Sequence, residues 1–250
     1  CNRLHDRELL APMDLAFAPG QLHAILGPNG AGKSTLLRLL SREWPSPDGA
    51  ISFNGRPLSA WTAQELARMR AVLPQTHALA FPFLVTEVVA LGRLHAQTGT
   101  RSEERAIVSA ALAASGADHL ASRLYSQLSG GERARVQLAR VLAQVWTEVE
   151  SGPRYLLLDE PTAHLDLAFQ HACLRLARQW AARGVGVIAV LHDPNLVLSY
   201  ADTVSVLCCG ELLAHGAPQQ ILQPDLIHRV YGLHAKMLDA GSGTPWLAIS

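Results

Sequence analysis

The stretch GPNGAGKST at residues 27–35 constrains the fold of this chain more than any other. Its three glycines allow a tight turn whose backbone N–H groups point inward at an anion. The apolar run Leu22–Leu26 predicts a buried strand before the turn, and residues 34–40 predict a helix whose N-terminus faces the same anion. Lys33 can reach phosphate oxygens, and the Ser34 hydroxyl can ligate Mg²⁺. The alternative is an ordinary glycine turn before a helix, which does not require a lysine and a serine at these positions. The stretch therefore predicts a phosphate-binding loop.

Length and charge narrow the class of protein. The 250 residues suit one large α/β domain, or a core with a subdomain inserted in it. Basic and acidic side chains balance at 21 each, so no net field favours nucleic acid and we expect no nucleic-acid partner. No stretch approaches the roughly 20 uninterrupted apolar residues of a membrane span. The N-terminus lacks signal-peptide features and an initiator Met, so we expect a few further residues upstream.

Cysteine usage indicates the redox environment. The four cysteines are Cys1, Cys173, Cys208 and Cys209, and they lack the spacing of a metal site. We expect free thiols in a reducing, cytosolic compartment. The adjacent pair falls in the strand-like run 203–209, which predicts that its two side chains point to opposite faces of a sheet.

Apolar, β-rich runs recur along the chain with helical stretches between several of them, which predicts a mostly parallel sheet covered by helices. The runs are residues 22–26, 71–73, 155–158, 185–191 and 203–209. Residues 86–94, 102–114 and 130–145 predict helices of an inserted α-helical subdomain. The stretch AISFNGRPL, after a turn at 46–49, predicts a small antiparallel β piece. We expect one α/β domain over 1–250, with a nucleotide-binding core at about 1–75 and 150–250 and a helical subdomain at about 76–149.

The stretch RYLLLDE at 154–160 ends a predicted buried strand in two carboxylates, at the edge where α/β proteins bind ligands. Asp159 is suited to holding Mg²⁺ through water. Glu160 follows on the other side of the pleat and is suited to polarising the water that attacks a γ-phosphate. A solvated strand end is the alternative for this stretch alone, and Lys33 in the same chain argues against it.

The stretch LSGGE at 128–132 predicts a second anion site. Ser129, Gly130 and Gly131 offer a hydroxyl and unhindered N–H groups at a helix N-terminus. One chain then has two phosphate-binding ends. The economical arrangement is that a second copy completes each site, which predicts a head-to-tail homodimer enclosing two ATP molecules.

Six motifs, in this order, make the chain resemble the ATP-binding cassette ATPases, which are P-loop NTPases with a RecA-like core: GPNGAGKST, Gln75, LSGGE, LLLDEPT, HLD and LHD. The resemblance covers essentially the whole chain and implies ATP and Mg²⁺ as cofactors. It implies nucleotide binding by Gly27, Pro28, Asn29, Gly30, Ala31, Gly32, Lys33, Ser34, Thr35, Ser129, Gly130, Gly131 and Asp166. It implies metal binding by Ser34, Gln75 and Asp159, and catalytic roles for Glu160, His192 and Gln75.

The sequence departs from the family pattern at two points. The family commonly stacks adenine on an aromatic residue before the phosphate loop, and the stretch NRLHDRELL contains none, so we expect His5 or Arg3 to lie against the base. The run 163–166 reads AHLD where SALD is commoner, which leaves Asp166 in place.

A narrower resemblance is to the ATPases of haem importers, in the iron-chelate and vitamin B12 importer group. The segment PFLVTEVVALGRLHAQ carries the resemblance to the group. The resemblance to haem importers rests on VQLARVLAQVW, TEVESGPRY, DEPTAHLDLAFQH and VLHDPNLVLSYAD. It implies two separate membrane permease subunits, a periplasmic haem-binding protein and a peripheral location at the cytoplasmic face of the bacterial inner membrane. We expect an exposed apolar surface for the permease, formed by Phe81, Phe83, Leu84 and Val85 beside Arg93. We expect no direct binding of cargo by His77, His95, His171 or His215.

Three alternatives stay open on the sequence. The same engine could serve a permease for a ferric siderophore or cobalamin. The second alternative is of a different class: a soluble regulatory or assembly module switched by ATP. The presence of Glu160 favours ATP hydrolysis over such passive switching. A small-molecule kinase is the third, and the stretch LSGGE argues against it.

Overall fold

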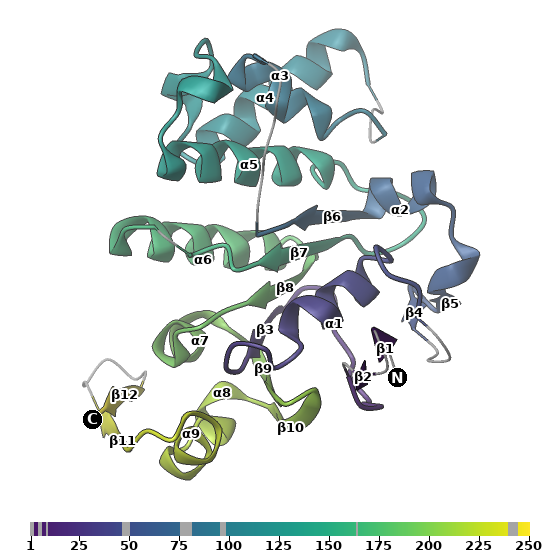
Figure 1. Cartoon of the computed structure of the whole chain (residues 1–250). Helices are drawn as coiled ribbons and strands as arrows, with labels where there is room; N and C mark the ends of the chain where they lie inside the picture. Colours follow the sequence, from purple (N-terminus) through teal and green to yellow (C-terminus); the bar gives the residue numbers. More distant parts are fainter. Residues whose placement is uncertain are drawn as a thin grey trace.

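The structure is a computed structural model that describes residues 3–4, 7–8, 10–46, 51–75, 82–95, 99–163, 165–239 and 245–250. Its centre is a six-stranded sheet with the strand order β10-β9-β3-β8-β7-β6 (Figure 1). All neighbouring strands run parallel except β10, which pairs antiparallel with β9 at one edge. The strands are β3 (Leu22–Leu26), β6 (Arg70–Leu73), β7 (Tyr155–Asp159), β8 (Gly186–Val190), β9 (Thr203–Cys208) and β10 (Glu211–Gly216).

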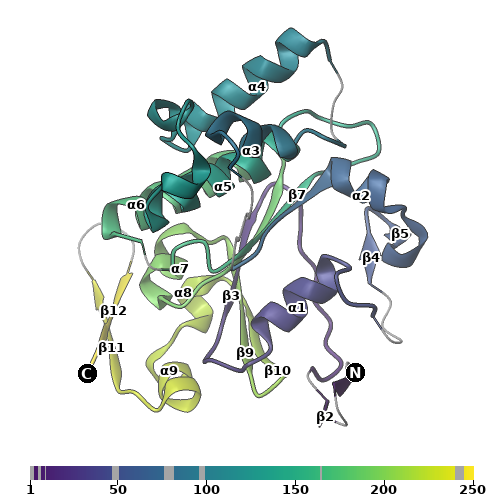
Figure 2. The same cartoon turned by 45° about the horizontal axis from the view of Figure 1, so that its top comes forward.

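Helices cover both faces of this sheet, as Figure 2 shows. Helix α1 (Lys33–Leu40) packs on one face, and α6 (Leu167–Ala181) and α7 (Pro194–Tyr200) pack on the other. Strand β3 contributes to both cores, because Ala24 and Leu26 lie in the cluster with α6 and α7 while Ile25 lies in the cluster with α1. This alternation explains why the strand is apolar at every position except His23, which is itself buried.

Three helices form a separate layer above β6 in Figure 1: α3 (Val85–Leu91), α4 (Arg101–Ala114) and α5 (Gly130–Gln144). They share a hydrophobic cluster of their own. Helix α5 joins this layer to the sheet, because Val136 and Ala139 lie in the helical cluster and Leu138 and Leu142 in the sheet cluster. The subdomain limits near residues 76 and 149 stay a prediction.

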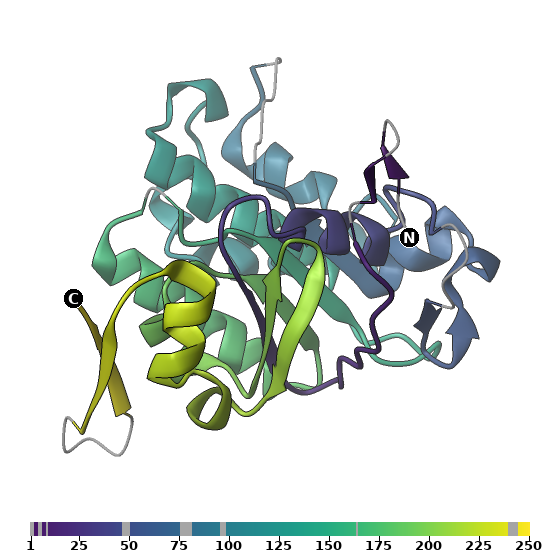
Figure 3. The same ribbon diagram turned by 60° about the horizontal axis from the view of Figure 1, so that its bottom comes forward.

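The remaining elements flank the core. They are β1 (Arg3–Leu4), β2 (Arg7–Glu8), β4 (Ser52–Phe53), β5 (Arg56–Pro57), α2 (Ala63–Met69), α8 (Pro218–Ile221), α9 (Pro224–Tyr231), β11 (Ala235–Asp239), β12 (Pro245–Ile249) and 3-10 turns at Leu58–Ala60, Asp118–Leu120 and Tyr125–Gln127. Figure 3 shows the β11–β12 pair in yellow beside α9. The Asn195 side chain at the start of α7 donates to the Leu247 carbonyl at 3.0 Å and accepts from the Leu247 N–H at 2.7 Å. These two bonds attach β12 to α7.

The sequence-based fold class is confirmed: the sheet is mostly parallel, β4 and β5 are a small antiparallel pair, and helices cover the sheet. The strand predicted at 203–209 ends one residue earlier, at Cys208. The helix predicted at 86–94 ends at Leu91. Most of the predicted turn at 46–49 lies outside the described residues. None of the helices in the described part of the chain combines the length and the apolar character that a membrane crossing requires.

The predicted apolar surface for the permease is partly wrong. Val85 is fully buried and Arg93 is 1% exposed, because Arg93 pairs with Glu104 of α4 at 2.6 Å and donates to the Ala143 carbonyl of α5 at 2.8 Å. Leu84 is exposed, as expected. Phe81 and His77 lie outside the described residues.

Candidate functional site

The loop between β3 and α1 has the backbone that its sequence predicts. Gly27, Gly30 and Gly32 have positive φ angles of 153°, 78° and 98°. A Cβ atom on Gly27 would lie 2.1 Å from the carbonyl oxygen of Leu207 in β9, so the close approach of the two backbones also requires glycine. Helix α1 begins at Lys33 with no side-chain cap. Its first N–H groups are therefore available to an anion.

Lys33 is folded onto this loop. Its ammonium group donates to the Gly27 carbonyl at 2.8 Å and to the Pro28 carbonyl at 2.9 Å. Burial lowers the pKa of Lys33, while the nearby carboxylates of Glu160 and Asp159 act in the opposite direction. The carbonyl oxygens thus hold a cation at the place where the loop would receive phosphate oxygens.

Ser34 and Asp159 lie together at the base of the loop. The Ser34 hydroxyl donates to Asp159 Oδ1 at 3.2 Å. Burial raises the pKa of Asp159, and the bond from Ser34 partly offsets this. A hydroxyl and a carboxylate are the hard oxygen donors that Mg²⁺ prefers, and Mg²⁺ takes its other ligands from water and phosphate. The described residues hold no cluster of three His, Cys, Asp or Glu side chains suited to a metal.

Glu160 lies between Gln75 and His192. Gln75 Nε2 donates to Glu160 Oε2 at 2.8 Å, and His192 Nε2 lies 2.8 Å from Glu160 Oε1. The three residues follow the carboxyl ends of β6, β7 and β8, which are consecutive in the sheet. Glu160 has a φ of 51°, an uncommon conformation for a residue with a Cβ atom and one that clusters at functional sites. The sheet order explains how the sequence brings these side chains together.

The N-terminus of α5 faces the same edge. Ser129 caps the helix, since its hydroxyl accepts from the Glu132 N–H at 3.3 Å while Glu132 Oε2 accepts from the Ser129 N–H at 2.8 Å. A cavity of 510 Å³ separates this end from β7, with Gly130 on one side and Gln75, Asp159 and Glu160 on the other. Ser129 and Gly130 are exposed. Lys33 and Ser34 do not line this cavity.

The other predicted residues divide into two groups. Pro28, Asn29, Ala31 and Thr35 lie with the three glycines in the loop and the first turn of α1. Asp166 caps α6 instead, because its Oδ1 accepts from the Phe169 N–H at 2.8 Å. In the described part of the chain, no hydrogen bond or ion pair joins the side chain of Asp166 or Ser129 to the loop 27–35. His5 and the side chain of Arg3 lie outside the description.

Two side chains near the site were missed at the sequence level: Tyr231 near Gly27, and Arg133 in the lining of the 510 Å³ cavity. Arg133 lines it together with Tyr125; its guanidinium donates to the Ser126 carbonyl at 2.7 Å and lies 5.8 Å from the Tyr125 ring centre. The sequence could have indicated Arg133, because this residue follows LSGGE directly in the first turns of α5. Burial raises the pKa of Tyr231 to about 12 beside Gly27, a long-range contact with no local signal.

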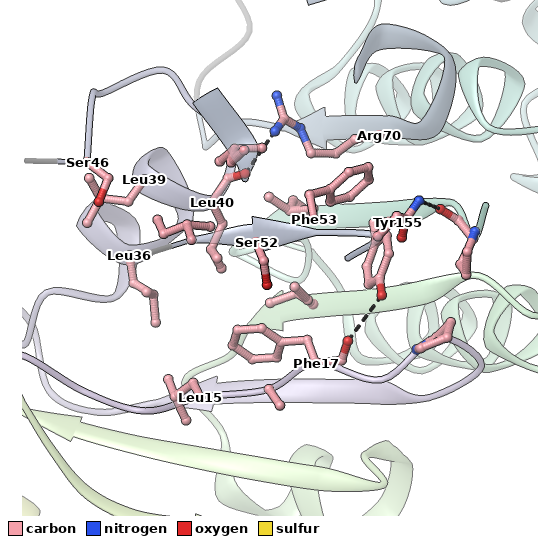
Figure 4. Close-up of a pocket in the computed structure, with 18 of the residues that line it drawn as sticks. Leu15, Phe17, Leu36, Leu39, Leu40, Ser46, Ser52, Phe53, Arg70 and Tyr155 are labelled. Carbon is pink, nitrogen blue, oxygen red and sulfur yellow. Dashed lines mark hydrogen bonds between the residues drawn. The ribbon is translucent and has the colours of Figure 1, made fainter. Parts of the chain in front are cut away.

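A larger cavity, of 690 Å³, lies away from all these groups (Figure 4). Apolar side chains of α1, such as Leu36 and Leu39, line it with Phe17 and Phe53. Arg70 lies at one end and donates to the Leu40 carbonyl at 2.9 Å. The chemistry-bearing residues of the loop and of the strand ends are absent from its lining. Size alone therefore does not identify the site.

A family profile described as ABC transporter matches residues 10–163. The protein named Hemin import ATP-binding protein HmuV in Gloeobacter violaceus is 50% identical over 237 residues, covering 94% of this chain and 86% of the relative. The protein of the same name in Burkholderia cenocepacia is 48% identical, covering 97% and 94%. The one in Myxococcus xanthus is 49% identical, covering 92% and 86%.

Solved structures agree with these relatives. An inward-facing metal-chelate type ABC transporter matches with a TM-score of 0.74 and 27% identity, covering 93% of this chain and 86% of that chain. The cbiO1 protein of Clostridium perfringens, part of the ABC transporter complex cbiONQ, matches with a TM-score of 0.72 and 27% identity, covering 88% and 86%.

Proposed function

The chain belongs to the ABC transporter family, and we propose that it is the ATP-hydrolysing subunit of a haem importer, working through a separate membrane permease. The near-50% identity to hemin import ATP-binding proteins, over almost the whole chain, carries the proposed cargo. The position of Glu160 between Gln75 and His192 carries the proposed hydrolysis.

Nucleotide binding in this proposal is an exchange of partners at the loop 27–35. Lys33 leaves the carbonyl oxygens of Gly27 and Pro28 and donates to β- and γ-phosphate oxygens. The uncapped N–H groups of α1 bind the same phosphates. Ser34 and Asp159, with Gln75, would hold Mg²⁺, which neutralises charge on the phosphate oxygens when it is bound.

Glu160 is the proposed general base. It accepts a proton from water while the water oxygen forms a bond to the γ-phosphorus and the bond from that phosphorus to the bridging oxygen breaks, giving ADP and phosphate. The bonds from Gln75 and His192 orient the carboxylate before the reaction. His192 is the proposed sensor of the γ-phosphate, because its side chain is 43% exposed and can exchange Glu160 for a phosphate oxygen.

We further infer a head-to-tail homodimer in which Ser129, Gly130 and Gly131 of one copy complete the site on the loop of the other. The exposure of Ser129 and Gly130 at the end of α5 supports this arrangement, since such an end can receive a phosphate from outside its own chain. Two permease subunits and a periplasmic haem-binding protein would complete the importer, with this chain bound peripherally at the cytoplasmic face of the inner membrane. The chain itself would not touch the cargo.

Reconstitution tests the proposal. The ATPase, its permease and its binding protein are placed in liposomes, and uptake of haem, a ferric siderophore and cobalamin is compared with and without ATP. We expect ATP-dependent accumulation of haem alone. Accumulation of another cargo would keep the ATPase role and reject haem. Failure of the chain to associate with any permease would favour a soluble module switched by ATP.

A further inference from the structure

The hairpin turn between β9 and β10 carries two adjacent cysteines and lies directly against the loop 27–35. Cys208 pairs with Glu211 across the hairpin, so Cys209 and Gly210 form a two-residue connection. The Gly210 N–H donates to the Ala31 carbonyl at 3.1 Å. A change in this turn therefore acts on the backbone of the loop.

The turn breaks a local sequence rule. Cys209 and Gly210 have φ angles of 50° and 82°, and two consecutive positive φ values are typical of a type I′ hairpin turn. Asn, Asp or Gly usually occupies the first of these positions, because their side chains tolerate the left-handed conformation. Cysteine has no such property, and Cys209 is exposed, so packing does not explain it. A residue that breaks a local rule without a structural gain marks a candidate for function.

The two thiols face each other. The Sγ atoms of Cys208 and Cys209 lie 3.8 Å apart, so the expectation that they point to opposite faces is wrong: Cys209 belongs to the turn and not to the strand. Burial raises the pKa of the half-buried Cys208, and its neighbour Cys209 raises it further. The exposed Cys209 is therefore the thiol that a reagent from solution meets first.

We propose that Cys208 and Cys209 form a vicinal dithiol that a hydroperoxide oxidises reversibly to a disulfide, and that this closure weakens the hold of the loop 27–35 on nucleotide. The Cys209 thiolate attacks the hydroperoxide, forming a sulfur–oxygen bond while the O–O bond breaks, and an alcohol, or water from hydrogen peroxide, leaves. The Cys208 sulfur then attacks the sulfenic sulfur, forming the disulfide while the sulfur–oxygen bond breaks and water leaves. The thiols lose two protons and two electrons, and the hydroperoxide accepts both.

Closure must change the turn. Consecutive Cα atoms are about 3.8 Å apart across a trans peptide, whereas disulfides usually join Cα atoms about 4.4–6.8 Å apart. A disulfide forced into this turn is strained, and strained disulfides are easily reduced, which makes the site reversible. The same distortion acts on the bond from Gly210 to Ala31 and on Leu207, whose carbonyl lies against Gly27. The effect on nucleotide rests on the proposed function of the loop, but the disulfide itself does not.

The test uses the full chain, with Cys1→Ser in every sample so that the thiol at position 1 cannot pair. The protein is treated with hydrogen peroxide, alkylated and digested with trypsin. The peptide 184–229 contains Cys208 and Cys209 and no other cysteine, lysine or internal arginine. We expect it to lose two hydrogen atoms and to escape alkylation, with full recovery after dithiothreitol. Hydrogen exchange of the loop 27–35 should then be faster, and the Kd for a fluorescent ATP analogue about five-fold higher, the value of one backbone hydrogen bond.

Cys209→Asn is the matched control. Asparagine suits the left-handed position and carries no thiol. This variant should therefore keep the Kd of the reduced protein, and treatment with hydrogen peroxide should not change that Kd. Oxidation of Cys209 to a sulfinic acid without a disulfide would overturn the proposal, and so would a disulfide that leaves hydrogen exchange of the loop unchanged. A reduced chain that binds no nucleotide would instead reject the proposed function, while the mass and exchange measurements would still decide the role of the dithiol.

Discussion

His192 Nε2 lies 2.8 Å from Glu160 Oε1, and the other oxygen of the same carboxylate accepts a bond from Gln75. The structure thus fixes the carboxylate from both sides, with groups that follow the two strands next to its own. Such a carboxylate is oriented before a nucleotide arrives, which is the arrangement that a general base requires.

Replacing Glu160 with glutamine tests this base directly. The amide oxygen of Glu160→Gln can still accept a hydrogen bond from Gln75, but it cannot take up a proton at neutral pH. We expect ATP hydrolysis to fall by about 10²–10⁴-fold, with ATP binding retained. Steady-state phosphate release and equilibrium nucleotide binding, measured on the same preparation, check this. Retained turnover would remove Glu160 from the role of base.

Lys33→Ala should weaken nucleotide binding itself. A hydrogen bond from a charged donor contributes about 1.5–3 kcal/mol, so the Kd for ATP should rise about ten- to a hundred-fold. Lys236 in β11 is the only other lysine of the chain, and Lys236→Ala is the matched control. Isothermal titration measures the Kd for ATP of both variants. An equal loss of ATP affinity in the two would argue against the predicted contact between Lys33 and the phosphates.

Comparing Gly27→Ala with Gly30→Ala separates the effect of steric overlap from that of backbone strain. The added Cβ would meet the Leu207 carbonyl at 2.1 Å, whereas at Gly30, which also has a positive φ, it would meet nothing within 4 Å. We expect Gly27→Ala to lower the free energy of unfolding by about 1–3 kcal/mol more than Gly30→Ala does, because β9 must move. Urea unfolding of both variants measures the difference. Equal losses would show that strain alone sets the requirement for glycine.

Arg93 should stabilise the helical layer through a buried ion pair. Arg93→Met leaves Glu104 and the Ala143 carbonyl without their cation, and we expect a loss of about 3–5 kcal/mol in the free energy of unfolding. Adding Glu104→Leu to Arg93→Met should recover part of this loss. Chemical unfolding of the single and double variants tests the prediction, and a double variant less stable than Arg93→Met would contradict it.

His23 should make stability depend on pH. Burial lowers its pKa in the folded chain, where its ring nitrogens lie 2.6 Å from Thr203 Oγ1 and 2.9 Å from the Ala18 carbonyl. Below about pH 6.5 the unfolded chain therefore binds more protons at this residue than the folded chain does. The free energy of unfolding should fall as pH decreases from about 6.5 toward the lowered pKa, and level off below it. In His23→Gln this part of the pH dependence should disappear, as thermal unfolding at several pH values can show.

The parts of this structure that sequence predicts are those set by local pattern. The loop 27–35 follows from glycines and a lysine at fixed spacing, and β3 and α1 follow from the apolar runs on either side of it. The placement of Gln75, Glu160 and His192 at one edge of the sheet also follows, because each residue comes after a strand of a parallel sheet. The two bonds to Glu160 do not, since they depend on which strands are adjacent and on side-chain conformation.

The two wrong expectations have a common cause. Arg93 lies in a segment for which the family resemblance implies an exposed surface, but its ion pair with Glu104 of the next helix holds it in the interior. Cys209 continues an apolar strand in the sequence, but hairpin geometry places it in the turn. Pairings between elements decide both outcomes, and these pairings are absent from the local sequence pattern.

The two bonds between Asn195 and Leu247 give the C-terminal end of the chain a mechanical connection to the site. Asn195 stands three residues after His192, so a displacement of β12 acts through these two hydrogen bonds on the segment that carries this histidine. A fluorophore attached near residue 250 would therefore sense movement of His192 from outside the nucleotide site. For the same reason, a bulky fusion partner is better attached at another position on the surface.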